Sequence, residues 1–415
     1  MTHPTTERYC IKMLAGAAGA DRDTRGGGRR QPIVVGVALS VLTGAAIWLG
    51  TVQGWRMGAL WLLGAALGLV LYHAGFGFAA AFRSLLAQGR GAGLRAQMLM
   101  LGTAVVLMQP AISAGDLLGL PVRGLVFPLG LGVLVGAFLF GIGMQLGGGC
   151  ASGTLYAAGG GGVRNLLTLA CFVAGATIAA SQADLWQDWP ALPPMTLQQA
   201  VGLPAAMLLA LSAFALTWWA SSVLEGRRHG AVEPILPRQG AAPRRSLLSG
   251  PWPLAWGALA LAVLNLGTLA LAGRPWAITA AFPLWGSLAV ERLGWDDPVF
   301  WTYWEEPTRA EALLRPLAAE RTTVMDLGLV AGAMLAAGLA GRFAPDWRIG
   351  AGPAAASVLG GLLLGIGAVL AFGCNVSAYV SGIASGSLHG WGWIGPALLG
   401  NWVGLRLRPA FGLQK

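Results

Sequence analysis

The chain is built from continuous apolar segments of about 20 residues, the length that an α-helix needs to cross a bilayer. Hydrophobic residues make up 55% of its 415 residues and charged residues only 11%, whereas soluble domains carry about a quarter charged residues. Because the segments do not alternate between apolar and polar residues, they argue against an outer-membrane β-barrel. The pattern predicts an all-α integral membrane protein.

Short polar stretches join the apolar segments. We expect about nine or ten transmembrane helices from these candidates: 33–50, 57–74, 96–114, 125–146, 165–183, 203–224, 254–273, 325–341, 354–372 and 391–406. Three further apolar pieces are too short to span and touch glycine or proline breaks, so half-helices or re-entrant turns are predicted there. These pieces are 76–87, 276–290 and 376–386.

Basic residues set the predicted orientation. Arginines cluster after the second, sixth, eighth and tenth spans, whereas acidic or proline-rich joints separate the others. Since cytoplasmic loops carry the excess of Lys and Arg, both ends of the chain are predicted to be cytoplasmic. Residues 1–31 are expected to form a disordered basic tail. Residues 32–224 then form the first membrane half, 225–250 a cytoplasmic linker and 251–415 the second half.

Two cysteines occupy equivalent breaks in two of the spans. Three glycines directly precede Cys150, and Gly373 precedes Cys374. The interval between the two cysteines recurs between Gly136 and Gly360. The spans before the two breaks run in opposite predicted directions, so the halves are predicted to be inverted and pseudo-symmetric. Glycine-broken spans at matching places in two halves point to a transport site near the bilayer midplane.

The two breaks also predict what the site binds. Helices that begin just past Cys150 and Cys374 would present free N–H groups and positive dipole ends to a passage, and such ends attract anions. A thiol is a weak donor suited to a soft sulfur acceptor, so the site favours a small anion with a sulfur end. The further candidates for substrate binding are Gly148, Gly149, Ser152, Gly373, Asn375, Ser377, Tyr379, His389 and, more weakly, Gly77, Tyr156 and Cys171.

Structural roles compete with several of these assignments. A buried cysteine is usually a small hydrophobe, and Cys171, inside an unbroken span, is best interpreted that way. His389 is equally compatible with a proton gate and with a helix cap near the membrane interface. A structural hydrogen bond explains four polar neighbours of the thiols as well as substrate contact does: Tyr156, Asn375, Ser377 and Tyr379.

Other site classes are disfavoured. The cysteines form no CxxC motif and the four histidines are scattered, so no metal site and no cofactor is predicted. The glycine runs lack the following Lys-Ser/Thr of a phosphate-binding loop. The net charge of +10 follows the tail and the predicted cytoplasmic joints and forms no aromatic-interleaved patch, so no nucleic-acid partner is expected.

Three motifs, at 147–156, 273–282 and 373–391, resemble the YeeE/YedE family of bacterial inner-membrane proteins. The resemblance implies an hourglass-like, pseudo-twofold helical bundle that takes up thiosulfate and passes it between cysteines through S–H···S hydrogen bonds. It also implies a small TusA-like sulfur-carrier protein as a cytoplasmic partner. Cys150 and Cys374 match two of the family's relay cysteines, whereas Gly77 stands where the family often has its first one.

Together the residues and the resemblance predict a permease for thiosulfate or a related small sulfur-containing anion, not an enzyme. Cys150 and Cys374 are its predicted successive contacts. Two alternatives stay open: a membrane thiol-redox enzyme that uses these two cysteines, and a transporter of sulfite or of a selenium compound. A purely structural scaffold would leave the repeated glycine breaks without a purpose.

Overall fold

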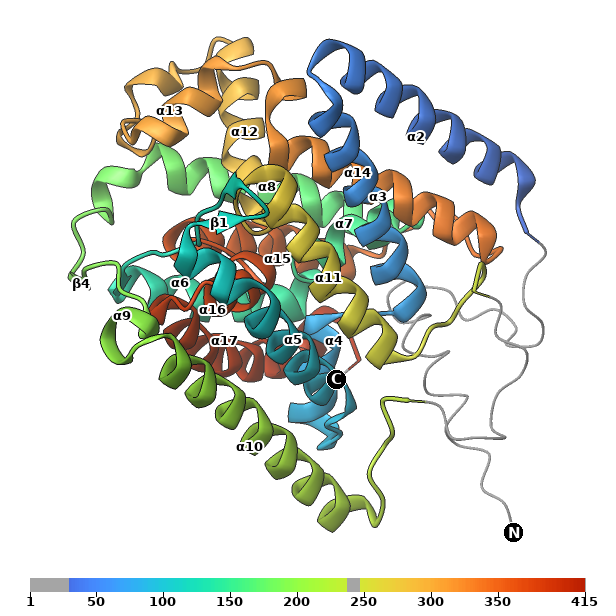
Figure 1. Cartoon of the computed structure of the whole chain (residues 1–415). Coiled ribbons are helices and arrows are strands. Elements are labelled where there is room, and N and C mark those ends of the chain that lie inside the picture. Colours follow the sequence, from blue (N-terminus) through green and yellow to red (C-terminus); the bar gives the residue numbers. More distant parts are fainter. Residues whose placement is uncertain (1–29, 237–246, 415) are drawn as a thin grey trace.

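The computed structural model describes residues 30–236 and 247–414, and this part of the chain is almost entirely helical. Figure 1 shows the long helices packed in one bundle. In the described part, nine helical stretches are long and apolar enough to cross a membrane, which confirms the predicted all-α membrane fold. Their long helices are α2 (Pro32–Val52), α3 (Trp55–Ala74), α5 (Ala92–Ala114), α6 (Leu131–Gly147), α8 (Val163–Ser181), α10 (Leu203–His229), α11 (Leu254–Ala272), α14 (Arg321–Leu339) and α15 (Ala351–Leu370).

The tenth predicted span is helix α17 (Leu388–Leu407), which has 20 residues but is not among the nine. It is less apolar because it carries His389, Asn401 and Arg406. The helix packs against α6, where Gln145 donates a hydrogen bond of 2.7 Å to Asn401 Oδ1. Its polar face is therefore turned partly into the bundle.

The three short apolar pieces form short helices, as predicted, and a further short helix follows Cys150. Two of them contain a π-helical stretch, in which the backbone winds more loosely than in an α-helix. In chain order they are α4 (Phe78–Arg83) with the π-helical η1 (Ser84–Gln88), α7 (Ala151–Gly159), the 3₁₀ turn η3 (Ile278–Ala280) with α12 (Ala281–Arg292), and the π-helical η7 (Asn375–Ser381) with α16 (Gly382–Ala384).

The remaining elements are small. The helical ones are η2 (Ala183–Leu185), α9 (Leu197–Val201), η4 (Pro298–Phe300), η5 (Thr302–Trp304), α13 (Pro307–Leu314), η6 (Leu317–Ala319) and η8 (Arg408–Phe411). Two antiparallel pairs of two-residue strands complete the set: β1 (Asp116–Leu117) with β2 (Leu120–Pro121), and β3 (Leu129–Gly130) with β4 (Ala191–Leu192). All four strands lie in joints on the side predicted to face out of the cell.

Glycines set how closely the long helices approach. Helix α3 packs on α14, α8 on α15, and α6 on both α15 and α17. A Cβ atom added to Gly68 of α3 would overlap the backbone of α14 at Leu329, and one added to Gly332 of α14 would overlap α3 at Ala65. In lipid the hydrophobic effect does not drive helices together, because lipid tails are as apolar as the side chains. Close van der Waals packing of backbones at small residues drives the association instead.

Helices α2 and α10 are the least buried of the nine spans, and Figure 1 shows them along opposite edges of the bundle. Helix α10 runs on to His229, into the stretch assigned to the linker. The predicted basic tail lies outside the described residues except for Arg30 and Gln31, as do residues 237–246 of the linker. The division into two inverted halves stays a prediction.

Candidate functional site

Cys150 lies at the start of a short helix, where α6 ends in a glycine-rich turn. Gly148 has a left-handed φ of 85°, which favours glycine because it lacks a Cβ, and it turns the chain out of α6. Cys150 is the N-cap residue of α7 and is 1% exposed. Its Sγ lies 3.3 Å from Ser152 Oγ, and N–H groups at the start of α7, including that of Gly153, lie close to the sulfur.

Cys374 has the same place at the second break. Phe372 and Gly373, with φ angles of 53° and 149°, turn the chain at the end of α15. Cys374 is the N-cap residue of η7 and is fully buried. Its sulfur accepts a hydrogen bond of 3.4 Å from the Ser377 hydroxyl, which in turn accepts one of 2.9 Å from the Cys374 N–H. The predicted start of a short helix just past each cysteine is confirmed.

The two thiol-bearing segments meet inside the bundle. Helix α7 packs against η7, and both pack against η3. The Thr279 hydroxyl of η3 lies 3.2 Å from the Ser377 hydroxyl. Both are free cysteines. Sequence reasoning missed Thr279, although it belongs to the motif at 273–282.

Asn375 places an unused amide beside Cys374. It is fully buried, and neither its Oδ1 nor its Nδ2 has a hydrogen-bond partner among the described residues. The buried Thr154 Oγ1, four residues past Cys150, likewise lacks one within that part of the chain. A buried polar group left unpaired costs about 1–3 kcal/mol. A ligand that forms hydrogen bonds with these groups would offset that cost.

The sequence matches a family model described as sulphur transport over residues 73–403. The chain belongs to this sulphur-transport family. Thiosulfate transporter TsuA of Spirochaeta thermophila is 30% identical over 290 residues, which cover 66% of this chain and 77% of that protein. Thiosulfate transporter TsuA of Escherichia coli is 26% identical over 355 residues, or 82% and 92% of the two chains. Probable transporter YedE of Salmonella typhimurium is 31% identical over 168 residues, 39% of each chain.

Family and fold together make the chain a multi-pass membrane transporter of sulfur compounds. The resemblance to the YeeE/YedE family is thereby confirmed. Its relatives are bacterial and its spans are helical, in agreement with a place in the bacterial inner membrane. The family match begins at His73, at the end of α3, so α2 and most of α3 lie outside it.

His389 of this sulphur-transport family member lies behind an aromatic pair beside Cys374. Its Nδ1 is 2.7 Å from Ser387 Oγ, and its ring meets Phe127 edge-on with centroids 5.2 Å apart. Phe127 in turn stacks on Phe372, with centroids 5.1 Å apart and planes 8° apart. Ser387 is the N-cap residue of α17, but no side chain caps that helix. Both interpretations of His389, as a proton gate and as a helix cap, stay predictions.

The weaker candidates of the transporter occupy separate places. Gly77 is the N-cap residue of α4, and a Cβ atom there would lie 3.5 Å from the Tyr156 hydroxyl. The transporter thus brings these two residues together next to α7. Tyr379 stacks on an indole ring of α17 with centroids 6.2 Å apart. Cys171 lies on α8 where that helix crosses Gly361 of α15, a packing position.

An outer cavity of the transporter, of about 360 Å³, reaches the aromatic residue two positions before Cys374. Its wall combines Phe372 with side chains from two joints on the side predicted to face out of the cell, among them Trp186, Thr302 and Arg309. Sequence reasoning missed this cavity because its residues come from joints that carry no motif. The tryptophans and charged residues gathered in those joints were the one available signal.

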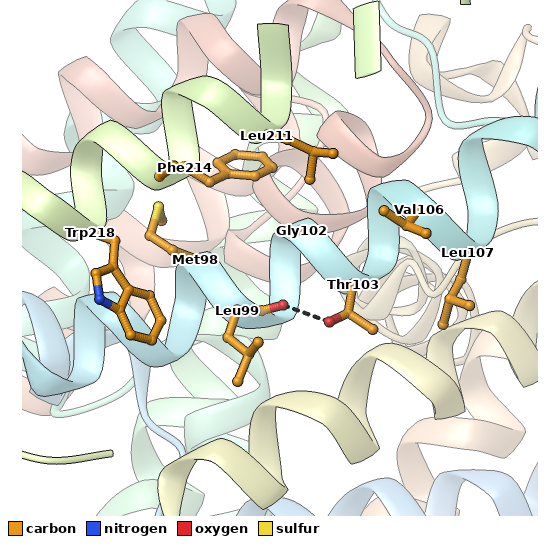
Figure 2. Close-up of a pocket in the computed structure, with 10 residues that line it drawn as sticks. Met98, Leu99, Gly102, Thr103, Val106, Leu107, Leu211, Phe214 and Trp218 are labelled. Carbon is orange, nitrogen blue, oxygen red and sulfur yellow. Dashed lines mark hydrogen bonds between the residues drawn. The ribbon is translucent and has the colours of Figure 1, made fainter. Parts of the chain in front are cut away.

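A larger groove of the transporter, of about 560 Å³, lies between α5 and α10. Figure 2 shows its lining side chains, which are mostly apolar and include Leu107, Leu211 and Phe214. The Thr103 hydroxyl already donates a hydrogen bond of 2.8 Å to the Leu99 carbonyl oxygen. An apolar wall with its hydroxyl already bonded does not suit an anion.

Proposed function

We propose that the chain is a permease that brings thiosulfate, or a closely related small sulfur-containing anion, into the cell past Cys374 and then Cys150. The observation that carries this proposal is the meeting of two N-cap thiols, from distant parts of the chain, in one buried polar site. Two relatives named as thiosulfate transporters support the choice of substrate.

Binding divides between the two ends of the anion. Each thiol donates a weak S–H hydrogen bond to the terminal sulfur, which is a soft acceptor. The Asn375 amide and the Thr154 hydroxyl, both without a partner among the described residues, donate to the oxygens. The starts of α7 and η7 add the positive ends of their dipoles. No covalent bond forms or breaks, so the thiols are not consumed and the protein acts as a carrier rather than as an enzyme.

The anion follows a route through the outer cavity. It enters where Phe372 closes the cavity beneath the two joints, and it reaches Cys374 when this ring moves away from Phe127. It then passes to Cys150 and leaves along the glycine turn at Gly148. Both thiols are closed off from solvent, at 0% and 1% exposed, so the substrate crosses only when the protein changes conformation.

A partner protein completes the proposal on the cytoplasmic side. As the resemblance to the YeeE/YedE family implies, a small TusA-like sulfur-carrier protein takes up the anion or its sulfur after release. The Cys150 break lies toward the side predicted to be cytoplasmic, because α6 runs inward in the predicted orientation. The released anion would therefore meet such a carrier.

Uptake of radiolabelled thiosulfate by cells that carry the transporter tests the relay. Cys150→Ala and Cys374→Ala are expected to reduce uptake strongly. Cys171→Ala is the matched control, since it removes a thiol at the α8–α15 crossing and should leave uptake unchanged. Normal uptake in both site variants would reject the relay, and no uptake by the unaltered protein would point to another substrate.

Two further measurements separate the alternatives. Excess sulfite or selenite should compete poorly if a thiosulfate-like sulfur end is recognised, and strong competition would reassign the substrate. Mild oxidation that links Cys150 to Cys374 should stop uptake, because a disulfide leaves no S–H donor. If the two cysteines are instead oxidised and reduced repeatedly without net transport, the hypothesis of a thiol-redox enzyme replaces that of a permease.

A further inference from the structure

Three arginines gather beside the Cys150 break from three separate parts of the chain. Arg83 ends α4, Arg164 is the second residue of α8, and Arg408 follows directly after α17. Arg164 and Arg408 donate to the carbonyl oxygens of the adjacent residues Leu146 and Gln145 at the end of α6, and α4 packs against both α6 and α17. All three lie on the side predicted to be cytoplasmic.

No carboxylate of the described residues neutralises this group. The ion pairs in that part of the chain are formed by other arginines. Arg164 donates instead to Ser357 Oγ at 2.8 Å and to the Leu146 carbonyl oxygen at 2.6 Å. Arg408 donates to the carbonyl oxygens of Gln145 and Gln414, at 2.5 Å and 2.6 Å. Every one of these acceptors is neutral.

The three guanidinium groups keep donors to spare. A guanidinium has five N–H donors, and the contacts of Arg164 and Arg408 use two each. Arg83 donates no hydrogen bond within residues 30–236 and 247–414. Burial and the nearby charges of Arg83 and Arg164 lower the pKa of Arg408 to about 10. This value is still well above neutral pH, so Arg408 stays charged and the positive charges repel one another.

The cluster adjoins the turn that carries the thiol. Arg164 Nη1 lies 3.7 Å from the position of a Cβ on Gly148, two residues before Cys150. Arg164 and Arg408 also cap carbonyl groups at the end of α6, which is a structural role. Arg83 makes no such contact among the described residues, so its donors stay available to a ligand.

We infer that Arg83, Arg164 and Arg408 form a second anion site that holds a small divalent oxyanion on the cytoplasmic side of Cys150. Planar guanidinium forks match the oxygens of such anions, and a bound dianion relieves the repulsion among the three charges. Unlike the thiols, this site recognises oxygens and charge, so it also takes sulfate. The proposal that thiosulfate leaves the protein through this site rests on the proposed function, whereas the binding of sulfate does not.

Sulfate binding to the purified full-length protein, followed by thermal unfolding at constant ionic strength, tests the site. Sulfate should raise the unfolding temperature of the unaltered protein more than chloride does. Arg83→Gln should weaken sulfate binding about ten-fold or more, the loss expected for a charged hydrogen-bonding partner. Arg83→Lys should restore part of it. Arg348→Gln, which removes an exposed arginine on the same predicted side, should bind sulfate normally.

The outcomes separate this site from the thiol relay. Cys150→Ala should still bind sulfate, because the arginines and not the thiol recognise it. Sulfate binding that depends on Arg83 in a protein without thiosulfate uptake would reject the relay and leave the arginine site standing. Equal sulfate binding by Arg83→Gln and the unaltered protein would overturn the arginine site, and so would the absence of any sulfate effect, whatever the uptake assay shows.

Discussion

Gly136 of α6 and Gly367 of α15 face each other across a helix crossing that leaves no room for a side chain on either. A Cβ on Gly136 would lie 2.7 Å from the Gly367 carbonyl oxygen, and one on Gly367 would lie 2.5 Å from the Gly136 carbonyl oxygen. Gly143 likewise faces Gly360, whose carbonyl oxygen its Cβ would approach to 2.8 Å. The sequence repeat equates Gly136 with Gly360 and Gly143 with Gly367. Such reciprocal contact is what a twofold axis produces, whereas the inversion of the two halves stays a prediction.

Gly136→Ala and Gly367→Ala should each destabilise the bundle. Overpacking of this kind costs about 1–3 kcal/mol, because the backbones of α6 and α15 must move apart. The loss is measured as a lower unfolding temperature in detergent. Gly395→Ala is the control, since a Cβ there would meet nothing within 4 Å. If Gly395→Ala lowered the unfolding temperature equally, the close packing of α6 on α15 would not be the cause of the destabilisation.

The membrane fold was predictable because helix length and apolar composition are local properties. Each of the nine spans contains an apolar window of 18 residues, so it can be found without knowing which helices pack against it. The N-cap positions of Cys150 and Cys374 followed from the glycines before them, which end α6 and α15. Thr279 was not predictable in this way, because its contact with Ser377 joins residues 98 positions apart.

Asp326 shows a different limit of the sequence. The predicted span began at residue 325, which placed this carboxylate at the membrane boundary. Helix α14 in fact begins at Arg321, so Asp326 is carried inside the bundle and is fully buried. The capping residue determines where such a helix begins. Here Glu320 accepts hydrogen bonds from the N–H groups of Thr322 and Thr323, a cap that hydropathy does not detect.

Removing one partner of the buried Arg95–Glu225 ion pair should release α10. The pair joins α5 to α10 at 2.7 Å, with the two side chains only 2% and 0% exposed. Glu225→Gln leaves a buried charge unpaired, which costs about 3–5 kcal/mol, whereas replacing both partners with apolar residues should cost less than the sum of the single changes. Thermal unfolding of the single and double variants measures this. The exposed Arg315–Glu311 pair is the control, and Glu311→Gln should change stability by about 1 kcal/mol or less.

Acid should loosen α13 at the mouth of the outer cavity. Burial raises the pKa of Glu306, but hydrogen bonds from Thr308 and from the Arg309 N–H outweigh it, so the pKa lies below its ordinary value of 4.5. A carboxylate with a lowered pKa stabilises the fold above its ordinary pKa, and this contribution is lost as pH falls through the lowered value. The protection factors of the α13 amides, which correct for the slower intrinsic exchange in acid, should therefore fall below pH 4.5.

Glu306→Gln should show fast exchange in α13 already at neutral pH and lose the acid response. Glu305→Gln is the matched control, because it removes the neighbouring charge and keeps the N-cap hydrogen bonds of Glu306. An acid response in Glu306→Gln as large as in the unaltered protein would assign the effect to another group.

Gly77→Cys should restore a third thiol to the transport route. Gly77 has φ and ψ angles of −121° and 117°, which any residue adopts, and a Cβ there would meet only the Tyr156 hydroxyl at 3.5 Å and Ala80 Cβ at 3.6 Å. The new side chain therefore fits without strain beside α7, and thiosulfate uptake should rise because the anion gains another S–H donor. Gly77→Ala adds the same Cβ without sulfur and should leave uptake unchanged. If Gly77→Cys transports no faster than Gly77→Ala, two thiols are enough for this protein and Gly77 marks no missing relay position.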